Sequence, residues 1–182
     1  MKLSSIAALN ILLKLLLILS FVIALFFDLP QLEGKGMLFR APFFILGAFI
    51  VPIASVFKKP AKYPFFADIY LTLPFLLDTL GNIFGLFDSI VVFDDVIHMV
   101  NWVFIVMAFQ ALKLGKRSLL QGMLFGVGLI IIWEILEWTI SVDGFGILNG
   151  LNLSLADTLG DLFTSSLGSL VGAYFGMKHR SL

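Results

Sequence analysis

Long uninterrupted apolar runs dominate this chain and constrain its fold more than any other feature. The run "ILLKLLLILSFVIALFF", residues 11–27, is long enough for a helix that crosses a hydrocarbon core of about 30 Å. Hydrophobic residues make up 60% of the 182 residues and charged residues only 13%, whereas soluble domains carry roughly 25% charged residues. A membrane β-barrel would alternate apolar and polar residues, and these runs do not alternate. The sequence therefore predicts an all-α, polytopic membrane protein.

We expect a single domain, residues 1–182, that forms a bundle of six transmembrane helices. The spans are predicted at residues 4–27, 38–57, 65–87, 90–112, 119–141 and 156–177. Lysine and arginine collect at the N-terminus, in the even-numbered connections and in the C-terminal tail, so the positive-inside rule places both termini in the cytoplasm. Lys14, inside the first run, is expected to extend its side chain inward toward the membrane interface. The expected location is the cytoplasmic (inner) membrane.

Acidic and amide side chains follow the opposite distribution. In the six-span topology, the outer halves of the third to sixth spans bring seven carboxylates, two amides and one imidazole to a similar depth. These residues are Asp78, Asn82, Asp94, Asp95, His98, Asn101, Glu134, Glu137, Asp157 and Asp161. Neighbours within a span lie mostly three or four residues apart, so each of four helices presents polar side chains in one direction. Asp68, at the inner end of the third span, is left outside this set.

So many charges inside a membrane need partners. A charged side chain at the centre of the bilayer costs about 2.5–3.5 kcal/mol on insertion scales, so these residues are expected to face one another or water. Carboxylates a few ångströms apart cannot all stay ionised. The cluster can therefore bind protons, recruit Lys35 or Arg40, or hold a cation. Its oxygen ligands favour Mg²⁺, Mn²⁺ or Ca²⁺, while one histidine leaves Zn²⁺ or Fe²⁺ open.

We predict a site that binds a divalent cation in the outer half of the bilayer. The candidate metal ligands are Asp94, Asp95, His98, Glu134, Glu137, Asp157 and Asp161. The candidate catalytic residues are His98, Glu137 and Asp161. The candidates for substrate contact or support of the ligands are Asp78, Asn82, Asn101 and Arg40.

Several of these residues also have structural interpretations. Asp157 follows Ser154 at the spacing of a capping box, which would begin the sixth span. The two amides, Asn82 and Asn101, can bridge helices by hydrogen bonds. Asp88 is predicted to cap the N-terminus of the fourth span.

Other features predict how the helices pack. Small residues recur at every fourth position of the sixth span, where they would allow close packing: Ala156, Gly160, Thr164, Gly168, Gly172 and Gly176. Beside them runs a polar row that includes Asp161, Ser165 and Ser169. Trp133 and Trp138 are typical of an aromatic belt at the outer interface.

The connection 142–155 is rich in Gly and Asn, and both a lid over the cluster and a surface loop are compatible with it.

Four segments together resemble a known family. They read "DTLGN" at 78–82, "DDVIHMVNW" at 94–102, "WEILEW" at 133–138 and "DTLGDLFTSSLG" at 157–168. As a set they resemble the YjdF-like family of bacterial integral membrane proteins, over roughly residues 75–175. More loosely they are similar to VanZ-like proteins, which are associated with resistance to glycopeptide antibiotics, although Ser165 stands where the VanZ-like pattern has an asparagine. The resemblance implies a membrane protein but no particular reaction.

Three functional hypotheses follow. The first is a metal-dependent enzyme that acts on a lipid or on a lipid-linked phosphate, with the metal polarising a phosphoryl oxygen and activating water. The second is a transporter coupled to cations or protons, for which the repeated "DTLG" at 78–81 and 157–160 hints at internal symmetry. The third is a structural or accessory membrane protein whose polar network fixes helix register. The expected partners are the lipid bilayer and a lipid or lipid-linked substrate, and no nucleic acid.

Overall fold

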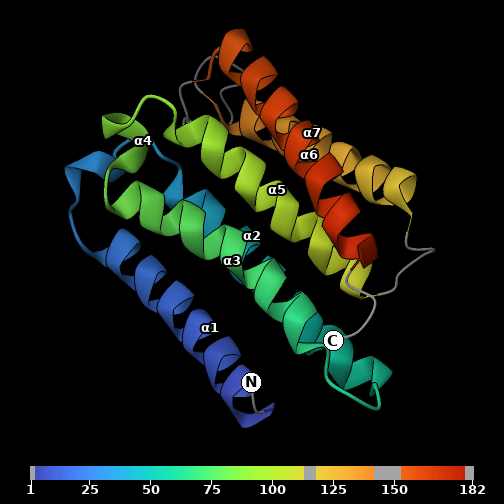
Figure 1. Ribbon diagram of the computed structural model, residues 1–182. Helices are drawn as coiled ribbons and strands as arrows, with labels where there is room; N and C mark the ends of the chain where they lie inside the picture. Colours follow the sequence, from blue (N-terminus) through green and yellow to red (C-terminus); the bar gives the residue numbers. More distant parts are fainter. Residues whose placement is uncertain (1–2, 113–117, 142–152, 179–182) are drawn as a thin grey trace.

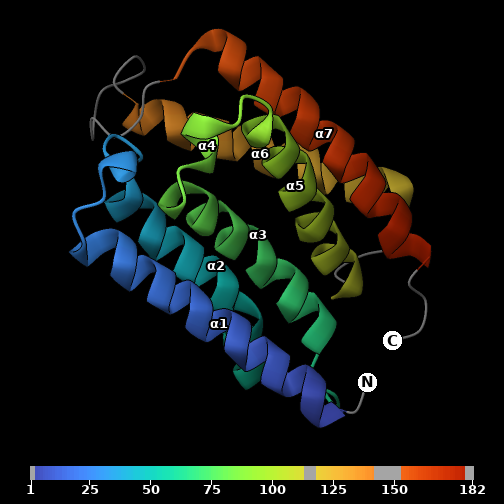
Figure 2. The same ribbon diagram turned by 60° about the vertical axis from the view of Figure 1, so that its left-hand side comes forward.

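A computed structural model describes residues 3–112, 118–141 and 153–178 as a helical bundle (Figure 1). The elements in these ranges are α1 (Leu3–Phe26), the 3-10 helix η1 (Pro30–Leu32), α2 (Met37–Lys58), α3 (Phe65–Ile83), α4 (Leu86–Ser89), α5 (Phe93–Ala111), α6 (Leu119–Ile140) and α7 (Leu155–Lys178). The long helices alternate in direction, with α3 and α5 between the α1–α2 pair and the α6–α7 pair (Figures 1 and 2). The start of α1 and the end of α7 therefore lie toward the same end of the bundle, opposite α4.

The described ranges are helical and include apolar helices long enough to span a membrane, which confirms the prediction of an all-helical membrane protein. Within the described ranges, four helical segments are long and apolar enough to cross a membrane: Ser5–Phe26, Met37–Lys58, Phe93–Ala111 and Leu119–Ile140. The remaining long helices, α3 and α7, have 19 and 24 residues and supply many of the buried polar side chains. Six spans with cytoplasmic termini remain a prediction.

The turn between the third and fourth predicted spans differs from expectation. The third helix ends at Ile83, four residues early, and Gly85 takes a φ of +64°, which glycine adopts without steric cost. The short helix α4 follows, and α5 begins only at Phe93. Asp88 lies inside α4 and forms an ion pair of 2.6 Å with Lys35 of the α1–α2 connection. The prediction that Asp88 caps the next long helix is therefore wrong.

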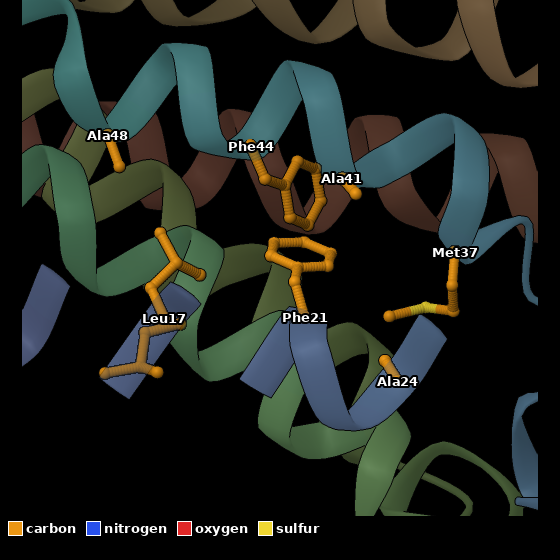
Figure 3. Packing of buried hydrophobic residues seen from close by; sticks show 8 residues of the cluster. Leu17, Phe21, Ala24, Met37, Ala41, Phe44 and Ala48 are labelled. Carbon is orange, nitrogen blue, oxygen red and sulfur yellow. The ribbon is translucent and has the colours of Figure 1, made fainter. Parts of the chain in front are cut away.

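An apolar core joins α1, α2 and α3 (Figure 3). Phe21 of α1 meets Phe44 of α2 edge to face, with ring centroids 6.0 Å apart and planes at 70°, an arrangement that aromatic pairs favour. Ala41 and Ala48 lie one turn to either side of Phe44 and are buried. Large apolar side chains also cover the outside of the bundle, as expected of helices that face lipid.

The small-residue row predicted for the last span packs α7 closely against α5. A Cβ atom at Gly168 would collide with the carbonyl group of Met99, and one at Gly172 would lie 2.5 Å from the carbonyl oxygen of Val103. Both contacts are with the α5 backbone, which cannot move aside as a side chain can. The prediction of close packing is confirmed, and this approach sets the distance between the polar side chains of the two helices.

Lys14 was expected to extend its side chain toward a membrane interface. The structure shows instead that this side chain is buried. Its ammonium group lies 2.8 Å from Asp68 Oδ1, and it donates to the carbonyl oxygen of Ala48 at 2.5 Å and to Thr72 Oγ at 2.9 Å. The expectation is wrong because α2 and α3 together offer three acceptors inside the bundle.

Asp68, which was left outside the predicted site, is the centre of this second polar group. Its Oδ2 accepts hydrogen bonds from Asn10 Nδ2 and from the Tyr63 hydroxyl, both at 2.6 Å. Burial, together with the hydrogen bond to Asp68, raises the pKa of Tyr63, which lies in the connection before α3. The carboxylate thus has partners on α1 and on the α2–α3 connection.

Candidate functional site

A polar chamber of about 260 Å³ lies at the α4 end of the bundle. Residues from α2 to α7 line it, together with residues of the α1–α2 connection and Leu153, which precedes α7. Its lining consists of Glu33, Gly34, Lys35, Arg40, Asp78, Asn82, Phe87, Asp94, His98, Glu137, Leu153, Asp157 and Asp161. Most of the residues predicted to form the site therefore do converge, although they come from five different helices.

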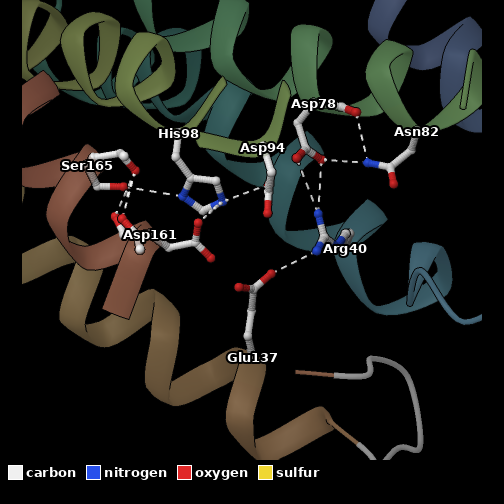
Figure 4. A network of polar contacts seen from close by, with 10 residues as sticks. Arg40, Asp78, Asn82, Asp94, His98, Glu137, Asp161 and Ser165 are labelled. Carbon is white, nitrogen blue, oxygen red and sulfur yellow. Dashed lines mark hydrogen bonds and ion pairs between the residues drawn. The ribbon is translucent and has the colours of Figure 1, made fainter. Parts of the chain in front are cut away.

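Arg40 joins three of these helices. Its Nη1 donates to both carboxylate oxygens of Asp78, at 3.2 and 3.3 Å, and its Nη2 donates to Glu137 Oε1 at 2.8 Å (Figure 4). Asn82 Nδ2 lies 3.5 Å from Asp78 Oδ2 and donates to the Asp78 carbonyl oxygen at 2.9 Å. The guanidinium group thus neutralises part of the acidic cluster and holds α2, α3 and α6 around the chamber.

A second group of side chains comes from α5 and α7, on the side of the chamber that these two helices form. Ligand atoms of Asp94, His98 and Asp161 all lie within 4.8 Å of one another. His98 Nε2 is 3.6 Å from Asp94 Oδ1 and 3.6 Å from Asp161 Oδ1 (Figure 4). Both distances exceed the usual 2.7–3.2 Å of an N–H···O hydrogen bond. A metal ion with ligands at about 2.0–2.6 Å would fit among these atoms.

The other ring nitrogen of His98 faces α7. Its Nδ1 is 3.3 Å from Ser165 Oγ, and Ser165 is fully buried. Histidine ligands in metal sites are usually oriented by such a contact on the nitrogen that does not bind the metal. Ser165 therefore contacts the His98 ring, whereas the sequence had placed it only in the polar row of α7.

Glu134 is a predicted ligand that the structure places elsewhere. Three residues along a helix correspond to a rotation of about 300°, so Glu134 and Glu137 diverge by about 60°. Glu137 reaches the polar chamber, whereas Glu134 lines a groove of about 380 Å³ between α6 and α7, with Ile131, Ile135, Trp138, Thr158 and Leu162. Both carboxylate oxygens of Glu134 are buried, and neither has a hydrogen-bond partner among the described residues.

Asp95 and Asp157 also differ from each other. Asp95 is exposed and does not line the chamber. Asp157 does line it, and its backbone N–H donates to Ser154 Oγ at 3.1 Å, which confirms the predicted N-cap of the last helix. Of the connection predicted as a lid or surface loop, residues 142–152 lie outside the described ranges, and Leu153 contributes to the chamber wall.

An apolar cavity of about 290 Å³ adjoins the chamber and was not predicted. Four residues belong to both spaces: Arg40, Asp78, His98 and Glu137. The cavity is otherwise lined by Phe44, Leu71, Pro74, Phe75, Asn101, Trp102, Ile105, Leu129, Ile132, Trp133 and Leu136. Trp133, which was expected in an interfacial belt, packs against Phe44 with ring centroids 5.6 Å apart. Sequence alone carried no signal for this cavity, because it depends on how four helices are spaced.

The chamber lining carries more acidic than basic side chains. Among the described residues, six carboxylates line the chamber, against the two basic residues Lys35 and Arg40. Arg40 is already shared by two of those carboxylates, and Lys35 pairs with Asp88 outside the lining. The arrangement is therefore suited to hold a cation or protons.

Comparison with known families gives a match over most of the chain. The sequence profile of a family described as Predicted membrane protein (DUF2238) matches residues 10–181. Neither the curated proteins nor the solved structures give a match. The similarities to YjdF-like and VanZ-like proteins remain resemblances in the motifs quoted above.

Proposed function

The chain belongs to the Predicted membrane protein (DUF2238) family, and we propose that it is a membrane-embedded enzyme that uses a divalent cation to hydrolyse a lipid-borne phosphate ester. The observation that carries the proposal is the convergence of ligand atoms from Asp94, His98 and Asp161 within 4.8 Å, on one wall of the polar chamber.

The ligand set resembles a catalytic site more than a closed structural one. Two carboxylates and one imidazole leave coordination positions for water and substrate, as catalytic metal sites require. The mixture of oxygen ligands with one nitrogen suits Mg²⁺ or Mn²⁺, and leaves Zn²⁺ or Fe²⁺ possible.

Electrostatics also supports a bound cation. With six carboxylates against two basic side chains, the part of the lining that the structure describes carries a formal excess of negative charge. Uncompensated charge is costly in a space walled by apolar helices. A divalent cation would offset two of these charges and would stabilise Asp94 and Asp161 in their ionised forms.

The same arrangement can support phosphate ester hydrolysis. A bound cation lowers the pKa of a coordinated water and polarises a phosphoryl oxygen. Asp157 lines the same chamber, and in this proposal its carboxylate takes the proton of the attacking water. The water oxygen would form the new P–O bond, the ester P–O bond would break, and the departing alkoxide would take up the proton that Asp157 received from the water. Arg40 and Lys35 line the chamber and can contact phosphate oxygens.

This assignment changes the role of His98. As a metal ligand through Nε2, it cannot also serve as the general base. The contact between its Nδ1 and Ser165 Oγ leaves Nε2 directed toward Asp94 and Asp161. We therefore assign His98 to the metal and Asp157 to proton transfer.

A binding titration tests the cation site. Purified protein in nanodiscs is titrated with Mn²⁺, and Asp161→Asn is compared with Asp95→Asn. Both variants remove one carboxylate charge, but Asp95 is exposed and lies outside the group of three. We expect Asp161→Asn to weaken Mn²⁺ binding at least tenfold and Asp95→Asn to leave it within about twofold. Equal effects of the two variants would contradict the assignment.

An activity assay then tests the reaction. Release of inorganic phosphate from lysophosphatidic acid is measured with Mn²⁺ or Mg²⁺ and after chelation. The proposal expects release that depends on the metal and is lost in Asp161→Asn. Tight metal binding without phosphate release from this or other lipid phosphates would reject the enzyme while retaining the cation site.

One observation favours transport as a second candidate. The Lys14–Asp68 pair gives α3 a second buried charged position, far along the helix from Asp78. Leu71, which lines the apolar cavity, lies between these two positions in the sequence of α3. Proton or Mn²⁺ flux into liposomes, abolished by both Asp68→Asn and Asp78→Asn, would support transport. The hydrolase proposal expects no such flux.

A further inference from the structure

The apolar cavity beside the polar chamber suggests which part of a substrate lies there. Resting on the proposed function, we propose that this cavity binds the hydrocarbon chain of a single-chain amphiphile whose phosphate group lies at the cation site. The substrate class would then be a lysophospholipid-like or prenyl-like monophosphate, rather than a water-soluble phosphate.

The first argument is that the two spaces meet at the reactive groups. Arg40, Asp78, His98 and Glu137 line both the chamber and the cavity. A molecule that occupied both spaces would therefore need a polar part and an apolar part that meet beside these four side chains. Amphiphiles have this property, whereas inorganic phosphate and sugar phosphates do not.

The second argument comes from the walls of the cavity. Away from the shared residues, the lining is formed almost entirely by aliphatic and aromatic side chains, among them Leu71, Ile105 and Leu129. The volume, about 290 Å³, is at the lower end for ligand pockets. It suits part of one hydrocarbon chain and is small for two chains.

The third argument concerns access. Ile132 lines the cavity, yet 54% of its surface is exposed on the outside of the bundle. Ile132 is therefore a side chain that the cavity shares with the exposed surface of α6, the helix that contacts α2 through Phe44–Trp133 and Arg40–Glu137. A chain could enter from the bilayer while its head group enters the chamber.

The fourth argument is an unsatisfied acceptor at the junction. Asn101 lines the cavity next to His98, and its Oδ1 is buried without a hydrogen-bond partner among the described residues. Buried polar atoms are normally paired. A hydroxyl group close to the phosphate, such as the free glycerol hydroxyl of lysophosphatidic acid, would supply the donor.

Tryptophan fluorescence tests the proposal directly. Trp102 lines the cavity and is 7% exposed, so chains in the surrounding bilayer cannot reach it easily. In a Trp133→Phe/Trp138→Phe background, Trp102 is the sole indole of the chain's three tryptophans. Lysophosphatidic acid with a dibrominated acyl chain is the probe, because bromine quenches indole only at short range. We expect saturable quenching that unbrominated lysophosphatidic acid reverses.

A matched pair of variants separates the cavity from the membrane surface. Ile105→Phe/Leu129→Phe fills the cavity, whereas Leu120→Phe/Leu124→Phe adds the same rings to exposed positions of α6. We expect the filling variant to weaken the apparent affinity of the probe at least tenfold, and the surface variant to leave it within about twofold. Loss of a single buried methylene contact already changes affinity about fourfold.

Mn²⁺ binding, measured in the same samples, distinguishes the two proposals. Intact Mn²⁺ binding without saturable quenching of Trp102 would overturn the chain site and leave the cation site standing. Quenching that responds to the filling variant, in a protein that binds no Mn²⁺, would support the chain site and reject the metal-dependent reaction. Equal loss of quenching in the filling and surface variants would also overturn the chain site.

Discussion

Replacing Lys14 by methionine removes one partner of a buried ion pair and tests whether that pair stabilises the bundle. The Lys14 ammonium group has three acceptors within 2.9 Å, including Asp68 Oδ1 at 2.8 Å, and the Asp68 side chain is fully buried. Breaking a buried pair by removing one partner costs about 3–5 kcal/mol. Asp68 keeps its hydrogen bonds from Asn10 and Tyr63, so we expect the lower end, about 3 kcal/mol.

The assay is equilibrium unfolding in mixed micelles of a mild detergent and dodecyl sulfate, followed by circular dichroism. Lys178→Met is the control, because Lys178 is an exposed lysine in the last turn of α7. The double variant Lys14→Met/Asp68→Asn removes both charges and is expected to recover at least about 2 kcal/mol of the loss, since neutral replacements of a buried pair are often tolerated. A change below about 1 kcal/mol for Lys14→Met, equal to that of the control, would refute the reasoning.

Three further predictions concern α6 and α7. Gly168→Ala should lower the free energy of unfolding by about 1–3 kcal/mol, because its Cβ would collide with the α5 backbone. Gly128→Ala, where a Cβ meets no atom within 4 Å, should leave it unchanged or raise it by up to about 1 kcal/mol. Glu134→Leu should raise it by about 1–2 kcal/mol in the same assay, because the apolar side chain removes two buried carboxylate oxygens that have no hydrogen-bond partner in the described structure; a decrease would contradict this. Ser165→Ala should weaken Mn²⁺ binding about tenfold, whereas Ser166→Ala, whose hydroxyl bonds within its own helix, should not.

Helical periodicity was sufficient to predict which polar residues share a face over short distances. Residues four apart, such as Asp94 and His98, do point to the same space, as do Asp157 and Asp161. The small residues of α7 likewise predicted close packing, because a row of glycines and alanines can serve few other purposes on one face of a membrane helix.

Contacts between distant segments could not be predicted in the same way. Lys14 and Asp68 are 54 residues apart, and Arg40 and Glu137 are 97 apart. Each pair depends on the relative rotation of two helices, which the periodicity of one helix does not determine. Glu134 has a different explanation, because residues three apart on one helix diverge by about 60°, which is enough to place Glu134 in a groove separate from the chamber that Glu137 lines.

Pulsed electron paramagnetic resonance of bound Mn²⁺ tests the central claim most directly, because it detects nitrogen ligands of the ion. The account predicts one high-affinity Mn²⁺ site per chain, with hyperfine coupling to a single imidazole nitrogen that is lost in His98→Gln and kept in Asp95→Asn. Wild-type protein that binds no Mn²⁺, or that binds it without nitrogen coupling, would contradict the assignment of Asp94, His98 and Asp161 as the metal ligands.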